Sequence, residues 1–300
     1  MNKNYRILHD SDLSEAQIEA DVAAYLGYVT PFWSNSFKLK AVNEQLTGAD
    51  KLFDRFVPIY LQFKVSHGLK PLASNFTLSS PHYPLQKIRS FRRAKNINAD
   101  PTLYFRLRDK APHSNDFQHN VLMSLHQSPK QFAFYIAPLT LQYHEYSELL
   151  KVSLIDRFLN PNPFYFRDEN LFFENQRESI GLNPFLRAHV SISPHTLVDT
   201  SEHYYSYSKG GTNIAWHSGE KLKEDFRFST KLTEIFKIIN YDKEAGFSKS
   251  EYIENISRFI NSHNLDFQVD FEFPDETIAK FFNYLKKEFD IKVLVLQRKS

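Results

Sequence analysis

Four polar side chains in the first 64 residues have the chemical types that a metal-dependent phosphodiesterase needs. Gln62 and Lys64 stand two apart in IYLQFKV, Asp50 ends a Gly-Ala-Asp sequence twelve residues before Gln62, and Glu19 lies further upstream. Carboxylate and amide oxygens are hard ligands that suit Mg²⁺ or Mn²⁺. An ammonium group beside them can orient water and stabilise charge on a phosphate. This combination predicts phosphodiester hydrolysis.

The segment that carries Gln62 and Lys64 is predicted to be a strand. Every second residue from Ile59 to Val65 is apolar. Because side chains alternate across a strand, these apolar residues share one face, and Gln62 and Lys64 share the other. One face is therefore expected to pack on the core, which leaves the glutamine and the lysine side by side.

A hairpin is expected to bring Asp50 to that polar face. Residues 51–56 and 58–66 read as two strands joined next to a proline. In an antiparallel hairpin the start of one strand lies near the end of its partner. This geometry would place Asp50 close to Gln62 and Lys64.

The first helix is predicted in DLSEAQIEADVAAYLG. Asp12 and Glu15 have the spacing of a capping box, and Gly27 is expected to end the helix. Glu15 and Glu19 are four residues apart and therefore share a face. The expected buried stripe consists of Ile18, Val22, Tyr25 and Leu26.

Composition predicts a packed globular protein that resides in the cytoplasm. The chain has 300 residues, is 42% hydrophobic and contains 28 phenylalanines. It has no cysteine, which excludes disulfides, thiol nucleophiles and cysteine-bound zinc. The net charge of +2 predicts no global attraction to nucleic acid, so any basic surface must be local. No apolar run is long enough to span a membrane, and no membrane partner is expected.

The order of predicted elements favours an α/β fold. A helix near 114–127 lies between a strand at 102–107 and an unbroken apolar strand at 131–138, which is typical of a strand covered on both faces. Helices are also predicted at 220–239, 248–263 and 275–289, followed by a strand in IKVLVL. We therefore expect three parts: an α/β core over 1–150, an irregular aromatic-rich region over 151–218, and a helical region over 219–300.

A helix glutamate, then Gly-x-Asp, then Gln-x-Lys on an apolar strand resembles the PD-(D/E)XK nuclease superfamily. The similarity is to its Mrr-like restriction-endonuclease branch, in which glutamine replaces the second acidic residue, and it extends over about residues 10–140. It implies a restriction-endonuclease-like mixed sheet flanked by helices. Asp50 and Gln62 would bind Mg²⁺ or Mn²⁺, Lys64 would be the catalytic lysine, and Glu19 the helix carboxylate. Glu44 competes as a second carboxylate and metal ligand.

The resemblance further implies cleavage of DNA in defence against foreign DNA, alongside a protein partner that supplies recognition or activation. By analogy with enzymes that cut both strands, a homodimer would supply two active sites. The alternative is a catalytically silent protein of the same fold that binds nucleic acid or protein. A plain amphipathic hairpin with a solvated polar face would also explain the pattern.

A basic run in the loop-rich segment 67–101 is the candidate nucleic-acid surface. Cations facing phosphates, with an aromatic ring among them, are typical of such surfaces, although charge runs are often only solvated loops. The run comprises Lys87, Arg89, Arg92, Arg93 and Lys95. Gln118 and His119, at the start of a predicted helix, would either line the site and orient the lysine or a phosphate, or hydrogen-bond buried backbone.

Overall fold

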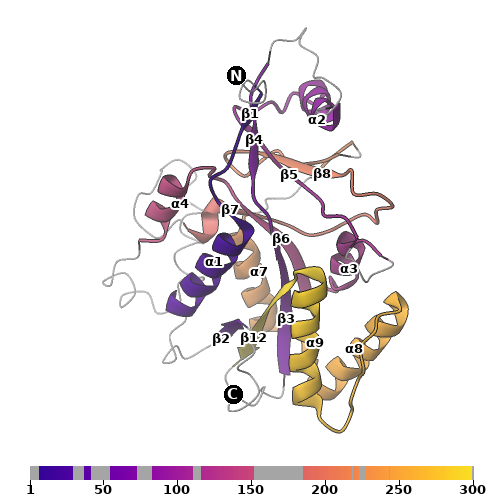
Figure 1. Cartoon of the computed structure of the whole chain (residues 1–300). Helices are drawn as coiled ribbons and strands as arrows, with labels where there is room; N and C mark the ends of the chain where they lie inside the picture. The colour runs from indigo at the N-terminus through magenta and orange to yellow at the C-terminus, as the bar shows by residue number, and fades with distance from the viewer. Residues whose placement is uncertain are drawn as a thin grey trace.

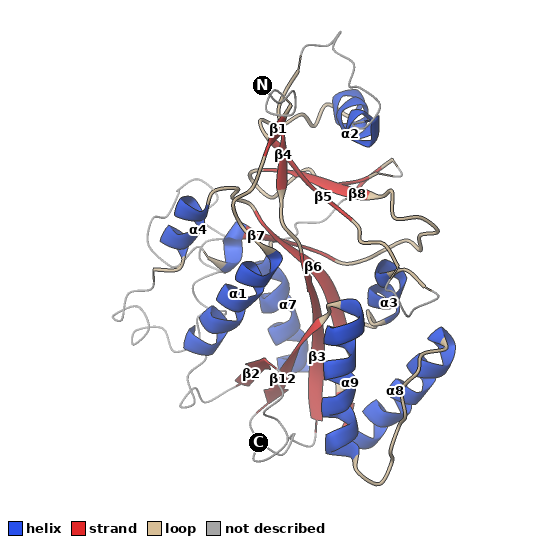
Figure 2. Cartoon of the chain, viewed as in Figure 1, coloured by secondary structure: helices blue, strands red, loops and turns tan. Residues whose placement is uncertain are grey.

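The chain folds into two β-sheets with helices around them (Figures 1 and 2). The computed structural model describes residues 7–29, 37–41, 55–72, 83–110, 116–151, 185–217, 219–222, 227–242 and 244–298. The predicted α/β class is confirmed, because helices and strands are mixed along the chain. Among the helices in these ranges, none is sufficiently long and apolar to cross a membrane.

The central sheet is mixed and contains β3, the strand that leads to Lys64. In order across the sheet, its strands are β2 (Phe37–Ala41), β12 (Lys292–Arg298), β3 (Arg55–Phe63), β6 (Phe132–Pro138) and β7 (His189–Ile192). The short β11 (Phe247–Ser248) also pairs with the start of β3. Only β3 and β6 run parallel, whereas the other pairs are antiparallel.

The second sheet is antiparallel throughout. Its order is β1 (Leu8–His9), β4 (His67–Leu69), β5 (Thr102–Arg106), β8 (Tyr204–Ser208), β9 (Ala215–Trp216) and β10 (Glu220–Lys221). β4 begins three residues after Lys64, so the chain passes from the mixed sheet to the antiparallel sheet directly after the predicted site.

Helices cover both faces of the mixed sheet. One face packs against α1 (Glu15–Val29) and α7 (Phe228–Tyr241). The other packs against α3 (Gln118–Ser124), α8 (Lys249–His263) and α9 (Pro274–Phe289). α2 (Tyr83–Ala94) packs on the antiparallel sheet. The short α4 (Tyr143–Leu149) and η4 (Leu186–Ala188) complete the helices that we name.

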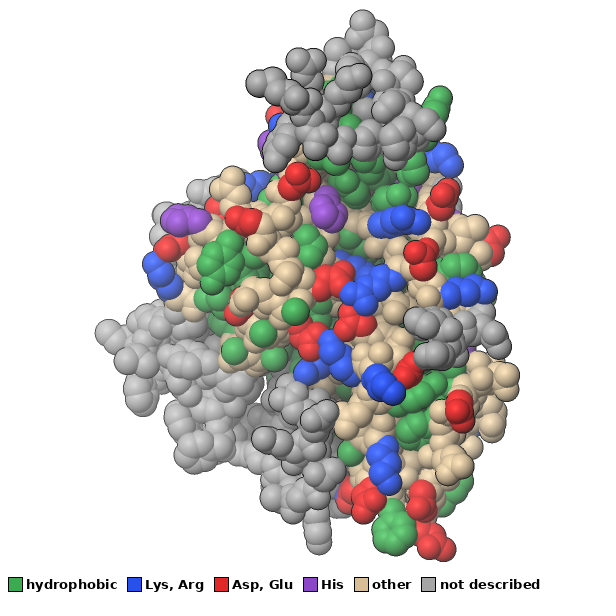
Figure 3. All heavy atoms as spheres, in the orientation of Figure 1, with side chains coloured by type: hydrophobic (Ala, Val, Ile, Leu, Met, Phe, Trp, Pro, Cys, Tyr) green, Lys and Arg blue, Asp and Glu red, His purple; other side chains and the backbone are tan. Residues whose placement is uncertain are grey.

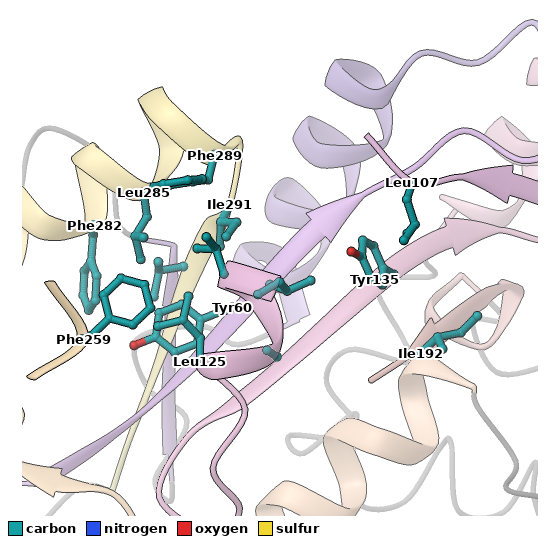
Figure 4. Close-up of a cluster of buried hydrophobic side chains, with 14 of the residues drawn as sticks. Tyr60, Leu107, Leu125, Tyr135, Ile192, Phe259, Phe282, Leu285, Phe289 and Ile291 are labelled. Carbon is teal, nitrogen blue, oxygen red and sulfur yellow. The ribbon is translucent and has the colours of Figure 1, made fainter. Parts of the chain in front are cut away.

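The alternation of β3 divides the core in two. Ile59 and Leu61 are buried beneath α1 and α7, whereas Tyr60 faces the opposite side. Figure 4 shows Tyr60 near Leu285 and Phe282 of α9. The unbroken apolar strand predicted at 131–138 is confirmed as β6, which is buried along its length. The two-faced burial follows from helices on both sides of the sheet.

The predicted hairpin between 51–56 and 58–66 is wrong. β3 is one continuous strand, and Pro58 lies within it, opposite Val295 of β12. At the start of β3, Phe56 has β11 on one edge and β12 on the other. Because both edges are occupied, no hairpin partner can add to this strand. A hairpin therefore does not bring Asp50 beside Gln62, and Asp50 and Glu44 lie outside the described residues.

The predicted ends of the first helix are also wrong, although its buried stripe is confirmed. The backbone N–H of Gln17 donates to Ser14 Oγ (3.1 Å), so Ser14 rather than Asp12 caps the helix. Asp12 instead accepts a hydrogen bond from the backbone of Tyr143. The helix continues through Gly27 to Val29. The predicted stripe from Ile18 to Leu26 is buried against the mixed sheet.

The carboxyl-terminal elements largely match their predictions. α8 begins with the expected capping box of Ser248 and Glu251, and α9 spans nearly the predicted residues. The helix predicted at 220–239 begins only at Phe228. β12 lies between β2 and β3, so the last third of the chain supplies an internal strand of the sheet begun in the first third. The part boundaries near 150 and 218 stay predictions.

Candidate functional site

Lys64 lies at the carboxyl end of β3, where the mixed sheet gives way to the antiparallel sheet. Its backbone N–H donates to the carbonyl of Ile136 at 2.8 Å, which extends the pairing with β6 by one residue. Its side chain is only 3% exposed, and Nζ lies 3.7 Å from Glu15 Oε1. Nζ makes no hydrogen bond to the described residues. The ammonium is therefore buried beside a carboxylate but is not tied to it by a hydrogen bond.

The surroundings of Lys64 favour its neutral form more than water does. Burial lowers the pKa of its ammonium to about 8, with Glu15 opposing the shift and Arg108 adding to it. Asp290 also opposes the lowering. A lysine that titrates close to neutral pH can exchange a proton during a reaction, which is common at functional sites. This property distinguishes Lys64 from a surface lysine.

Gln62 is buried on the same side of the strand, with its amide held in one orientation. Nε2 donates to the carbonyl of Phe289 (3.2 Å) and to Gln118 Oε1 (3.0 Å). A backbone carbonyl can only accept, so the NH₂ group rather than the oxygen must face Phe289. Gln62 Oε1 accepts no hydrogen bond from the residues that the structure describes. This oxygen remains available to a ligand.

A chain of ion pairs with alternating sign surrounds Lys64. Glu15 joins Lys64 to Arg108, Arg108 joins Glu15 to Asp290 (2.6 Å), and Asp290 leads to Lys286 (2.6 Å). Lys286 contacts Glu19, whose other oxygen is 3.5 Å from Lys292. We call these seven residues the charged cluster. Figure 3 shows charged side chains gathered on the face between α1 and α9.

The charged cluster has four cations and three carboxylates, so it carries an excess positive charge. Its elements come from distant parts of the sequence: α1, the end of β3, the residues after β5, the end of α9 and the start of β12. A cluster around Lys64 with one more cation than carboxylates favours binding of an anion such as phosphate.

Two of the predicted catalytic residues, Gln62 and Lys64, are both buried at the end of β3. The helix carboxylate beside Lys64 is Glu15, whereas Glu19 was predicted. Glu19 was expected near Lys64, but its pairs are Lys286 and Lys292, and Glu15, one turn earlier, contacts Lys64 instead. A helix turn of four residues leaves both glutamates on the same face, so the sequence could not separate them.

Among the described residues near Lys64, Gln62 Oε1 and the carboxylate of Glu15 are oxygen atoms of the type that binds hard metal ions. Within the described ranges, no group of three or more histidines, aspartates or glutamates has a metal-binding arrangement. Mg²⁺ takes amide and carboxylate oxygens and commonly keeps several waters. In the structure Gln62 contacts Gln118 and Phe289, whereas Glu15 contacts Lys64 and Arg108. Further ligands would be water or would come from outside these ranges, where Asp50 and Glu44 lie.

Gln118 and His119 are both buried at the start of α3, but they face different partners. Gln118 accepts the hydrogen bond from Gln62 and so helps to orient its amide. His119 Nε2 bonds the carbonyl of Thr196 (2.8 Å), and Nδ1 bonds the hydroxyl of Tyr135 (2.9 Å). Burial lowers the pKa of His119 to about 4, which keeps it neutral. Gln118 therefore supports the site, whereas His119 anchors backbone.

The basic run forms a helix, α2, and not the loop that was expected. Leu85 and Ile88 of this helix are buried, so its amphipathic pattern is that of a helix packed on a sheet. Arg92 is 1% exposed and bonds Ser206 Oγ and two backbone carbonyls, so the prediction that it contacts nucleic acid from the surface is wrong. The exposed cations of the run are Lys87, Arg93 and Lys95, and Arg89 is half-buried.

The sequence did not indicate that Asp290 and Lys286 lie near Lys64. The spacing of Lys286 and Asp290 is that of an i, i+4 ion pair at a helix end, which was visible in the sequence. Their approach to α1 was not, because it depends on the insertion of β12 beside β3.

No family model matches the chain, no curated protein matches it, and no solved structure matches it. The function proposed below therefore rests on the geometry around Lys64 and on the motif that contains Gln62 and Lys64.

Proposed function

We propose that the protein is a metal-dependent nuclease that hydrolyses phosphodiester bonds, with Lys64 as its catalytic lysine and DNA as the substrate. The observation that carries this proposal is the buried Lys64, with a pKa of about 8, beside Glu15 and on the same strand face as the available oxygen of Gln62. This combination of a low-pKa ammonium and hard oxygen atoms suits phosphoryl chemistry.

In this proposal each described residue has a distinct task. Glu15 and Gln62 Oε1 would hold Mg²⁺ or Mn²⁺, which when bound would supply Lewis-acid activation of the phosphate or of water. Protonated Lys64 stabilises the negative charge that builds on the phosphate oxygens. Arg108, which pairs with the other oxygen of Glu15, adds a second positive charge. Gln118 fixes the Gln62 amide. Asp50 and Glu44 stay predicted metal ligands.

The exposed cations of α2 provide the proposed surface for nucleic acid. Lys87, Arg93 and Lys95 are exposed on or next to this helix. α2 packs against the antiparallel sheet through Leu69 of β4, the strand that follows Lys64. Such cations would neutralise backbone phosphates without reading sequence. A cytoplasmic location, a homodimer, a recognition or activating partner and a role in defence against foreign DNA belong to the same proposal.

One observation favours the alternative, a catalytically silent protein of this fold. Both oxygens of Glu15 and both oxygens of Glu19 already have cationic partners. A closed ion-pair network can serve only to hold α1, α9 and β12 together. In that case Lys64 stabilises the fold, and the protein binds nucleic acid or a protein partner without cleaving it.

The test is incubation of the full chain with supercoiled plasmid, single-stranded DNA or RNA, in Mg²⁺, Mn²⁺ or EDTA. We expect the wild type to cleave nucleic acid when metal is present. Glu15→Gln should lower the cleavage rate by about 100-fold, because Glu15 contacts Lys64 and would bind the metal. Glu19→Gln serves as the comparison, since it alters the same helix face but not the contact with Lys64. Absence of cleavage by the folded wild type, or equal losses in both variants, would contradict the proposal.

A further inference from the structure

A cationic cavity lies between α2 and the antiparallel sheet, apart from the charged cluster. Its volume is about 300 Å³, and the residues that line it include Lys70, Arg89, Arg92 and Arg93. Asp100 is the carboxylate among its lining residues. Apolar side chains of β4 and the following residues form another part of the wall. We call this cavity the anion pocket.

Arg92 supplies this pocket with a buried positive charge that makes no ion pair with a carboxylate of the described residues. Its guanidinium donates to Ser206 Oγ (3.0 Å) and to the carbonyls of Asn213 (2.8 Å) and Ile97 (2.7 Å), which are all neutral. Its Nε is buried and has no hydrogen-bond partner among the described residues. A buried charge without a counter-charge is costly, and an anion in the adjoining pocket would offset that cost.

Arg89 adds a second guanidinium without a carboxylate partner in the described part of the chain. It donates to the carbonyl of Leu72 (3.1 Å) and contacts Gln86 Oε1 (3.5 Å). Burial and the charge of Arg93 both lower the pKa of Arg89. Arg89 and Arg93 are four residues apart, so they lie on the same face of α2. The pocket thus gathers like charges that repel one another.

We propose that the anion pocket binds the phosphate of a phosphate monoester, such as a nucleotide or the phosphorylated end of a nucleic-acid strand. A guanidinium can donate hydrogen bonds to two phosphate oxygens at once. Several guanidinium groups together suit a phosphate monoester, which carries nearly two negative charges. The cavity volume is at the lower end of the range of small-molecule sites, which fits a phosphate with a small organic group. This binding does not depend on Lys64 or on hydrolysis.

The experiment measures the thermal stability and binding of the full chain with inorganic phosphate, adenosine monophosphate, and a short oligonucleotide with either a 5′-phosphate or a 5′-hydroxyl. Chloride at matched ionic strength is the reference, because general screening must be separated from binding. We expect inorganic phosphate to raise the Tm of the wild type, and the 5′-phosphorylated oligonucleotide to bind more tightly than its 5′-hydroxyl form.

The variant Arg89→Gln/Arg93→Gln should weaken phosphate binding by about tenfold or more, because it removes charge-assisted donors from the pocket wall. Lys280→Gln/Lys287→Gln is the matched control, since it also removes two positive charges, and both lysines are exposed on α9 and do not line the pocket. Arg92 is left intact because its loss would disturb buried structure. Any of three results would overturn the proposal. Both variants could weaken phosphate binding equally, phosphate could have no effect beyond that of chloride, or the two oligonucleotides could bind with equal affinity. A preference between adenosine monophosphate and the phosphorylated strand identifies the source of the monoester.

Discussion

At the scale of single residues, the charge state of Lys64 carries most of the functional argument. The alternation in IYLQFKV was enough to predict that Gln62 and Lys64 share a strand face, and both are buried as a pair at the end of β3. The identity of the carboxylate was not predictable, because Glu15 and Glu19 are one turn apart on α1. Only the position of the helix along β3 decides which of them meets the lysine.

The low pKa of Lys64 predicts a specific pH dependence of stability. Its pKa is about 8 in the folded chain against an ordinary value of 10.5, so the unfolded chain binds more protons between these values. The contribution of Lys64 to stability therefore rises as pH increases through this window. We compare the free energy of unfolding of the wild type with that of Lys64→Met. The difference, wild type minus variant, should increase by on the order of 3 kcal/mol from below pH 8 to above pH 10. Denaturant unfolding at each pH measures it, and a pH-independent difference would refute the shift.

Gln62→Glu should destabilise the fold by about 1–3 kcal/mol, although it restores an acidic residue to the motif. A carboxylate cannot donate to the carbonyl of Phe289, which Gln62 Nε2 now does at 3.2 Å. The buried carbonyl would lose its donor and face a negative charge. Gln118→Met, which removes only the acceptor of the second hydrogen bond, leaves that contact with Phe289 in place. Chemical denaturation of the two variants compares these losses, and a Gln62→Glu variant as stable as wild type would show that the amide orientation is wrong.

At the scale of elements, local signals predicted the helices better than the pairing of strands. The capping box at Ser248 and the apolar run of β6 are short-range patterns, and both are confirmed. The basic run was predicted as a loop because its three arginines and two lysines concealed the buried positions of α2. The hairpin prediction failed because Pro58 was taken as a break, whereas it lies inside β3 opposite β12. Strand pairing depends on distant segments, which local patterns do not reveal.

Gly246, where the chain approaches the start of β3, should tolerate no side chain. Its φ is +80°, and a Cβ would lie 2.4 Å from the carbonyl oxygen of Phe56. Gly246→Ala should therefore lower the free energy of unfolding by at least about 2 kcal/mol. Gly210→Ala is the control, because a Cβ there meets nothing closer than 3.6 Å. Equal stabilities of the two variants in urea would contradict this account of the β11 connection.

At the scale of the whole molecule, the two ends of the sequence build one sheet. β12 near the carboxyl terminus separates β2 from β3, and β7 extends the sheet beyond β6. The α/β class could be predicted from the order of elements, but the sequence order does not state which strands are neighbours. The charged cluster has the same origin, since Asp290 and Lys286 reach α1 only because α9 leads into β12.

A fragment of residues 1–150 should not fold on its own. It lacks β12 and β7 and the helices α7, α8 and α9, which cover both faces of the mixed sheet. Exposed apolar faces and open strand edges would leave it unfolded or aggregated. Circular dichroism during heating should show no cooperative transition for the fragment and one for the full chain. A cooperative transition in the fragment would show that the amino-terminal half is an independent domain.

The central claim, that Lys64 is the catalytic lysine of a metal-dependent nuclease, is tested most directly by the Mg²⁺-dependent plasmid cleavage rate of wild type and Lys64→Met. Methionine keeps an unbranched apolar chain in the buried site, and matched Tm values would show that both proteins are folded. We predict metal-dependent cleavage by the wild type and a loss of about 1,000-fold or more in the variant. Folded wild type that does not cleave, or a variant that cleaves at the wild-type rate, would contradict it.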